Sequence, residues 1–133
     1  MLSSRTWRCA SADASFTMAS LTYHVVAEPY FVAGDPDQPY VPEAFDDDGF
    51  IHCTDGIPNV LATANCHYKD DARHWLALVI DKEKVGAEVR YEDPKRIYPH
   101  IYGPLNRDAI VSALPVKRDD DGTFLALELV KLG

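Results

Sequence analysis

Seven short stretches of alternating or continuous apolar residues predict that this chain is built mainly from β-strands. These stretches are rich in β-branched and aromatic residues, which favour strands. The run over residues 74–81 is almost entirely apolar, which indicates a strand buried on both faces. The predicted strands cover residues 21–27, 50–53, 74–81, 87–93, 97–105, 110–116 and 124–130.

One segment has helical periodicity instead. Residues 57–68 place apolar side chains three and four positions apart, so they predict a helix. Pro58 falls in its first turn, and Thr54 and Asp55 are residue types that cap helix starts. Residues 28–49 hold four of the nine prolines and predict a long irregular loop. Together these elements predict an α+β domain of about six or seven strands with one main helix.

The stretch around His52 combines a predicted short strand with the predicted start of a helix. Alternation places Phe50 and His52 on one face of a short strand and Ile51 and Cys53 on the other. Because a helix is expected to begin just afterwards, His52 is expected close to the free N–H groups of that helix, an arrangement that suits an anion. The alternative is that His52 is a hydrogen-bonded core residue.

A second group of rings occurs in the predicted strand over residues 97–105. Tyr98, His100 and Tyr102 share one side of this extended segment. Pro99 has no N–H to donate, which predicts an edge strand or a strand-like loop. The three polar-tipped rings form either a recognition surface or ordinary edge packing.

The first twenty residues differ from the rest of the chain. They are rich in serine and alanine, carry Arg5 and Arg8, and lack the continuous apolar segment of a secretory signal. We interpret residues 1–20 as a disordered or mis-annotated extension, with translation beginning at Met18. Residues 21–133 are then the single globular domain.

The net charge of the chain limits the classes of binding partner that it can have. A formal net charge of −8 argues against general affinity for nucleic acids or anionic membranes. It leaves small neutral or cationic ligands open, and also a small anion held by a local basic cluster. The three cysteines have no CxxC spacing, so neither a disulfide framework nor a zinc ribbon is indicated, and the reducing cytoplasm is the expected compartment.

Three of the five histidines, those at positions 24, 52 and 100, lie in the interior of predicted strands. If these strands are neighbours, the rings of His24, His52 and His100 face one cleft. Three histidines with an open position would also suit zinc, but no HxH or HxxxH spacing brings two of them together, and no metal site is predicted. Cys53 lies on the strand face opposite His52, so we expect it in the core rather than as a nucleophile.

Four motifs of the chain resemble those of a family of small bacterial and plant proteins, the domain-of-unknown-function family 952. The resemblance extends over about residues 21–116. Its motifs are Tyr23-His24-Val25-Val26, Gly49-Phe50-Ile51-His52-Cys53-Thr54, Val89-Arg90-Tyr91-Glu92-Asp93 and Pro99-His100-Ile101-Tyr102-Gly103-Pro104-Leu105.

The resemblance implies an ADP-ribosyltransferase-like fold, in which a split, mainly antiparallel sheet holds NAD in a central cleft. In that superfamily the first core strand carries a histidine or arginine near the adenosine ribose, and His24 has a similar position. A second strand leads into a helix, which resembles His52 and Thr54. A later strand usually supplies a catalytic glutamate, for which Glu92 is the nearest acid here.

The resulting hypothesis is a cleft that binds NAD or a related nucleotide, with transfer of a ribosyl or phosphoryl group as a further step. NAD is then a substrate, and no resident cofactor is expected. The alternative is a non-catalytic module that binds a small molecule or a partner; the oligomeric state is left open. The catalytic candidates are His52, His24 and Glu92, and the ligand-binding candidates are Tyr23, Thr54, Arg90, Tyr98, His100 and Tyr102.

Overall fold

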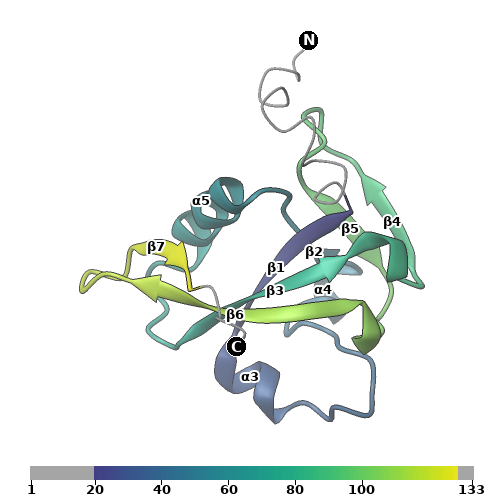
Figure 1. Cartoon of the computed structure of the whole chain (residues 1–133), viewed down its shortest axis with the longest axis horizontal. Helices are drawn as coiled ribbons and strands as arrows, with labels where there is room; N and C mark the ends of the chain where they lie inside the picture. Colours follow the sequence, from purple (N-terminus) through teal and green to yellow (C-terminus); the bar gives the residue numbers. More distant parts are fainter. Residues whose placement is uncertain (1–19, 129–133) are drawn as a thin grey trace, which may run out of the picture.

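Four antiparallel strands form the larger of two sheets in this computed structural model, which describes residues 20–128 (Figure 1). The strand order is β1-β3-β6-β7. The predicted extension over residues 1–20 lies outside the described residues apart from Ser20. The strands are β1 (Leu21–Ala27), β3 (Trp75–Asp81), β6 (Ile110–Arg118) and β7 (Phe124–Leu127).

Three further strands form the smaller sheet, in the order β2-β5-β4. Two backbone hydrogen bonds between Tyr23 and Thr54, of 3.0 and 2.8 Å, join the first strand of the larger sheet to the residues that follow β2. All strand pairs are antiparallel. The strands are β2 (Ile51–His52), β5 (Pro99–Tyr102) and β4 (Glu88–Tyr91).

The prediction that residues 97–105 lie at a sheet edge was wrong, because β5 is the central strand of the smaller sheet. Pro99 is tolerated there because it is the first residue of the strand, where its missing N–H interrupts no ladder. Its carbonyl still accepts a hydrogen bond of 3.0 Å from the Cys53 N–H.

The main helix α5 (Ile57–His67) agrees with the prediction to within one residue. The predicted caps do not form, because Gly56 is the N-cap residue and no side chain caps the helix. The Asp55 carboxylate instead accepts a hydrogen bond from the Tyr91 hydroxyl. The segment predicted as irregular contains two short helices, α3 (Glu28–Ala33) and α4 (Phe45–Asp48), and Pro29 fits in the first turn of α3.

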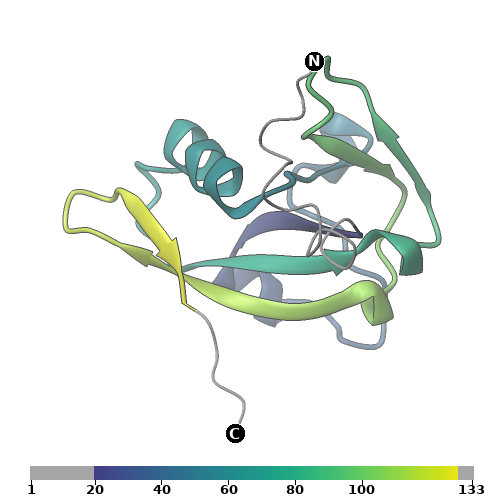
Figure 2. The same cartoon turned by 45° about the horizontal axis from the view of Figure 1, so that its top comes forward.

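Strand β3 separates two parts of the hydrophobic core. Trp75, Ala77 and Val79 pack in one cluster with Val60 and Ala64 of α5. Because side chains alternate along a strand, the intervening residues of β3 face the opposite side. In both views α5 lies near β7, whereas β4 and β5 lie at the other end of the larger sheet (Figures 1 and 2).

The second part of the core lies between the two sheets. There Leu78 and Ile80 of β3 pack in one cluster with Ile51 and Ile101, and all four side chains are fully buried. The burial of β3 on both faces confirms the prediction for that strand. The α+β class and the expected six or seven strands are also confirmed within the described residues. No helix between residues 20 and 128 is long and apolar enough to cross a membrane.

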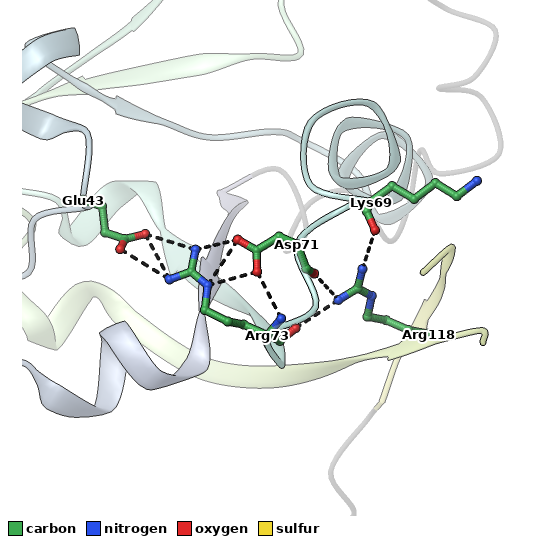
Figure 3. A network of polar contacts seen from close by, with 5 residues as sticks. All are labelled: Glu43, Lys69, Asp71, Arg73 and Arg118. Carbon is green, nitrogen blue, oxygen red and sulfur yellow. Dashed lines mark hydrogen bonds and ion pairs between the residues drawn. The ribbon is translucent and has the colours of Figure 1, made fainter. Parts of the chain in front are cut away.

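A polar network fixes the loop that follows α5 (Figure 3). The Arg118 guanidinium donates hydrogen bonds to the backbone carbonyls of Lys69, Asp71 and Arg73, and also to the carbonyl of Gly122. The Arg73 guanidinium binds the Asp71 carboxylate and lowers the pKa of Asp71 to about 2 through these hydrogen bonds. The network therefore ties the loop after α5 to the hairpin between β6 and β7.

Gly122 in that hairpin is expected to tolerate substitution far less well than Gly49. Both residues have positive φ, of +95° and +79° respectively. A Cβ at position 122 would lie 2.5 Å from the Lys69 carbonyl oxygen, whereas one at position 49 would meet nothing within 4 Å. We expect Gly49→Ala to cost about 1 kcal/mol of unfolding free energy and Gly122→Ala about 2 kcal/mol. Urea unfolding of both variants checks this ranking, and equal losses would contradict it.

Candidate functional site

Three polar side chains form a row across the smaller sheet. His52 of β2 is the register partner of His100 in β5, and His100 in turn is the partner of Arg90 in β4. The neighbouring row, Ile51 and Ile101, is buried against the larger sheet. Because directly paired residues project from the same face, the row of His52, His100 and Arg90 points away from the core.

Aromatic rings continue this outward face. The Phe50 ring stacks on the His100 ring at a centroid distance of 4.0 Å and an interplanar angle of 16°. It meets the His52 ring edge-on at 4.7 Å and lies 5.2 Å from the Tyr102 ring. The rings of His52 and His100 are 5.3 Å apart. We call this surface the aromatic–histidine face, and define it as Phe50, His52, Arg90, Glu92, His100 and Tyr102.

Each histidine of the face is paired with a carboxylate. His52 Nε2 lies 3.0 Å from Asp48 Oδ2, and His100 Nδ1 lies 3.0 Å from Glu92 Oε1. Because a carboxylate only accepts hydrogen bonds, it fixes which ring nitrogen carries the proton. In a neutral ring the other nitrogen, Nδ1 of His52 or Nε2 of His100, then has a lone pair available to a ligand.

Glu92, the carboxylate of the face, is held by two side chains of the face. Tyr102 donates its hydroxyl to Glu92 Oε1, the same oxygen that His100 approaches. These hydrogen bonds, from Tyr102 first and then His100, lower the pKa of Glu92, and the same contact raises the pKa of Tyr102. Glu92 Oε2 has no hydrogen-bond partner among residues 20–128 and is open to a ligand hydroxyl.

Arg90 completes the face on the β4 side. Its guanidinium carbon lies 4.6 Å from the centroid of the Tyr102 ring, and two of its nitrogens bond to the Glu88 carboxylate at 2.8 and 3.0 Å. The guanidinium of the face is therefore paired with the Glu88 carboxylate.

His24 does not join the other two histidines. Its ring is buried between the sheets, where Nδ1 lies 2.7 Å from the carbonyl oxygen of His52 and Nε2 lies 2.8 Å from the Tyr40 hydroxyl. Since a carbonyl only accepts, Nδ1 carries the proton and Nε2 accepts from Tyr40. Of the three imidazoles expected to share a cleft, the structure brings together only those of His52 and His100, and they lie on an outward face rather than in a cleft. His24 holds the backbone of His52 from behind.

The buried His24 makes the stability of the fold depend on pH. Burial lowers its pKa from 6.5 to about 4. The unfolded chain therefore binds more protons between these values, and acidification through that range destabilises the fold. Between pH 7 and pH 5 we expect His24 to account for a loss of about 2 kcal/mol in unfolding free energy.

Comparing unfolding at the two pH values in wild type, His24→Gln and His67→Gln measures this contribution. His67 is an exposed residue of α5, so its variant should keep the wild-type pH dependence. The His24 variant should be less stable at pH 7 but lose less on acidification. An unchanged pH dependence in His24→Gln would contradict a neutral, buried His24.

Among the residues that the structure describes, the face makes no side-chain hydrogen bond or ring contact with the three remaining predicted ligand-binding residues, Tyr23, Thr54 and Tyr98. Tyr23 and Thr54 are buried, and Tyr98 is 37% exposed in the segment before β5. Cys53 is buried as expected, and burial raises the pKa of its thiol. Between residues 20 and 128, no three or more His, Cys, Asp or Glu side chains are grouped so that they could hold a metal ion.

Two residues of the site were missed as candidates although the sequence carried a signal for each. Strand alternation puts Phe50 on the same face as His52, but only the fold shows that the Phe50 ring also stacks on His100. Asp48 lies four positions before His52, in an acidic run more typical of a solvated loop. Because α4 and Gly49 (φ +79°) turn the chain between them, the carboxylate comes back to the imidazole.

Similarity to known proteins agrees with this architecture. The crystal structure of protein CC0527 from Caulobacter crescentus has a TM-score of 0.68 and 22% sequence identity, over 79% of this chain and 93% of that chain. Its solution NMR structure has a TM-score of 0.62, over 77% and 90% of the two chains. At this identity the likeness shows the fold alone. No curated protein matches the chain.

The family resemblance expected from the four motifs is confirmed. The sequence profile described as "Protein of unknown function (DUF952)" matches residues 26–113, which is more than half of the chain and contains the whole aromatic–histidine face. The chain therefore belongs to the DUF952 family.

Proposed function

We propose that the aromatic–histidine face binds NAD or a related nucleotide, and that the two joined antiparallel sheets are an ADP-ribosyltransferase-like fold. One observation carries the proposal. The rings of Phe50, His100 and Tyr102 gather on an outward face beside two histidine–carboxylate pairs. Stacking surfaces next to polar groups of this kind suit a planar heterocycle attached to a ribose.

The charges of the face favour the cationic end of NAD. Glu92 and the two carboxylates that border the face, Asp48 and Glu88, outnumber Arg90, so a positively charged nicotinamide ring is attracted and a diphosphate is not. Arg90 contributes to ligand binding only when its guanidinium releases the Glu88 carboxylate and pairs with a ligand phosphate instead. In this proposal the nicotinamide ring stacks on Phe50 and Tyr102, and the free Glu92 Oε2 accepts a ribose hydroxyl.

A transfer step is compatible with this pose. The bond between the ribose C1′ and the nicotinamide nitrogen breaks, and its electron pair leaves with neutral nicotinamide. The carboxylate of Glu92 stabilises the oxocarbenium-like ribose that results. An acceptor oxygen then bonds to C1′, and its proton passes to Nδ1 of His52, whose Nε2 is held by Asp48.

Binding without turnover is the second candidate. The observation that favours it is exposure: the His52 side chain is 59% exposed and that of Glu92 44%. Group transfer usually takes place in a site from which water is excluded. An open face of this kind suits recognition of a small molecule or of a partner.

Calorimetric titration with NAD and ADP-ribose tests binding, and chromatographic assay of released nicotinamide tests turnover. We expect Phe50→Ala to weaken NAD binding about tenfold, because loss of one stacked ring removes about 1–3 kcal/mol. His52→Ala should reduce nicotinamide release more than it reduces affinity, and His67→Ala should match wild type. Absence of heat at millimolar NAD and ADP-ribose would overturn the proposal; heat without nicotinamide release would select the second candidate.

A further inference from the structure

We propose that a separate pocket, between α3 and the loop over residues 34–41, binds an α-amino acid with an apolar side chain. The pocket has a volume of about 240 Å³. This is below the roughly 300–1,000 Å³ of sites for drug-sized ligands, so its occupant is a smaller molecule. None of its lining residues belongs to the aromatic–histidine face, and the inference does not depend on the proposed function.

Three aromatic residues form part of the pocket wall. Tyr30, Phe31 and Tyr40 line it, with the Tyr30 and Phe31 rings edge-on to Tyr40 at 6.4 and 5.7 Å. Both tyrosine hydroxyls are already engaged: Tyr30 donates to the Val41 carbonyl, and Tyr40 contacts His24. The rings therefore offer apolar surface to an occupant, which favours an apolar side chain.

Two opposite charges line the same pocket without pairing with each other. The Arg107 Nε donates to the Gln38 carbonyl at 2.9 Å, and its guanidinium carbon lies 5.4 Å from the Phe31 ring centroid. The Asp35 Oδ1 accepts from the Asp37 N–H. Within residues 20–128, neither the terminal nitrogens of Arg107 nor Oδ2 of Asp35 has a hydrogen-bond or ion-pair partner.

An unpaired cation and an unpaired anion in one small apolar pocket are complementary to a zwitterion. The carboxylate of an α-amino acid can accept two hydrogen bonds from the Arg107 terminal nitrogens, and its ammonium can pair with Asp35. Gly34 keeps this end of the pocket open, because a Cβ there would lie 3.3 Å from Nη2 of Arg107. A simple carboxylic acid or a simple amine would leave one of the two charges unsatisfied.

Titration of ¹⁵N-labelled full-length protein with L-leucine and L-phenylalanine tests the proposal. The matched probes are 4-methylpentanoate, which lacks the amine, and 3-methylbutylamine, which lacks the carboxylate. We expect saturable amide shifts in residues 30–41 and Arg107 with the amino acids, and at least about tenfold weaker binding of both probes. Asp35→Asn should weaken amino-acid binding about tenfold but leave 4-methylpentanoate binding unchanged or stronger.

Arg107→Gln should weaken binding of both carboxylates, and Lys117→Gln, an exposed residue of β6, should match wild type. Since Arg107 also contacts Gln38, Gly34→Leu provides a second variant, which fills the pocket and should abolish binding while the far-ultraviolet spectrum is retained. The proposal is overturned by absence of saturable shifts at 20 mM amino acid, a high concentration for a specific site. Shifts confined to residues 48–52 and 88–102, or wild-type affinity in both charge variants, overturn it as well.

Discussion

Replacing Arg118 by alanine is expected to lower the free energy of unfolding by about 3 kcal/mol, because hydrogen bonds to four backbone carbonyls are lost together. The guanidinium also packs 4.2 Å from the centroid of the Phe124 ring, and this contact is lost as well. The loop after α5 would then no longer be fastened to the β6–β7 hairpin (Figure 3). Chemical unfolding followed by circular dichroism measures the loss.

Two variants control for charge and for position at Arg118. Arg118→Lys keeps the charge but replaces the planar fork by one ammonium, so it should recover only part of the lost stability. Lys117→Ala removes an exposed cation from the adjacent position and should change stability by no more than about 0.5 kcal/mol. Equal losses for Arg118→Ala and Lys117→Ala would show that the carbonyl contacts do not stabilise the fold.

The second large effect is expected at Ile101, on the inner face of β5. Its side chain is fully buried between the two sheets, so Ile101→Ala should cost about 3–4 kcal/mol of unfolding free energy. His100 is the adjacent residue, yet it projects from the opposite face. His100→Ala should cost about 1 kcal/mol or less, since the ring is partly exposed and has one hydrogen-bond partner.

The two variants should differ in the opposite sense in their affinity for NAD, with the larger loss in His100→Ala. His100→Ala removes a ring of the aromatic–histidine face and should weaken NAD binding, whereas any Ile101→Ala protein that remains folded should bind normally. This reversal between neighbouring residues follows from β5 being a central strand with one buried and one exposed face. A larger stability loss in His100→Ala than in Ile101→Ala would contradict the assigned register.

The local elements of the fold could be predicted from sequence because their signals are local. Strand β3 is a continuous apolar run, and α5 has regular helical spacing with Pro58 in its first turn. The central position of β5 could not be predicted, since Pro99 is read locally as an edge signal. Only the pairing with β2 and β4 shows that Pro99 starts the strand, where no N–H is required.

Only the local features of the candidate site could be predicted from sequence. Strand alternation placed His52, His100 and Arg90 on strand faces, but which strands are neighbours is a property of the tertiary structure. That pairing brings His52 and His100 together and leaves His24 behind the sheet. Whether a strand histidine is buried depends on which residues pack over its face of the strand. No pattern within Leu21–Ala27 indicates that Tyr40 packs against His24.

From its position behind β2, His24 also contacts the backbone of the aromatic–histidine face. Its Nδ1–H donates to the carbonyl of His52, so it fixes the backbone from which the exposed imidazole projects. His24 is therefore a positioning residue in the proposed function and not a group that touches the ligand.

The most direct test of the proposed function is side-chain NMR of the five histidines during titration with NAD. Long-range ¹H–¹⁵N correlation spectra report each imidazole separately, and His67 and His74 serve as internal controls outside the aromatic–histidine face. We expect saturable shifts of the His52 and His100 rings, with the rings of His24, His67 and His74 essentially unmoved. Unchanged His52 and His100 signals at millimolar NAD, or shifts confined to the other three rings, would contradict it.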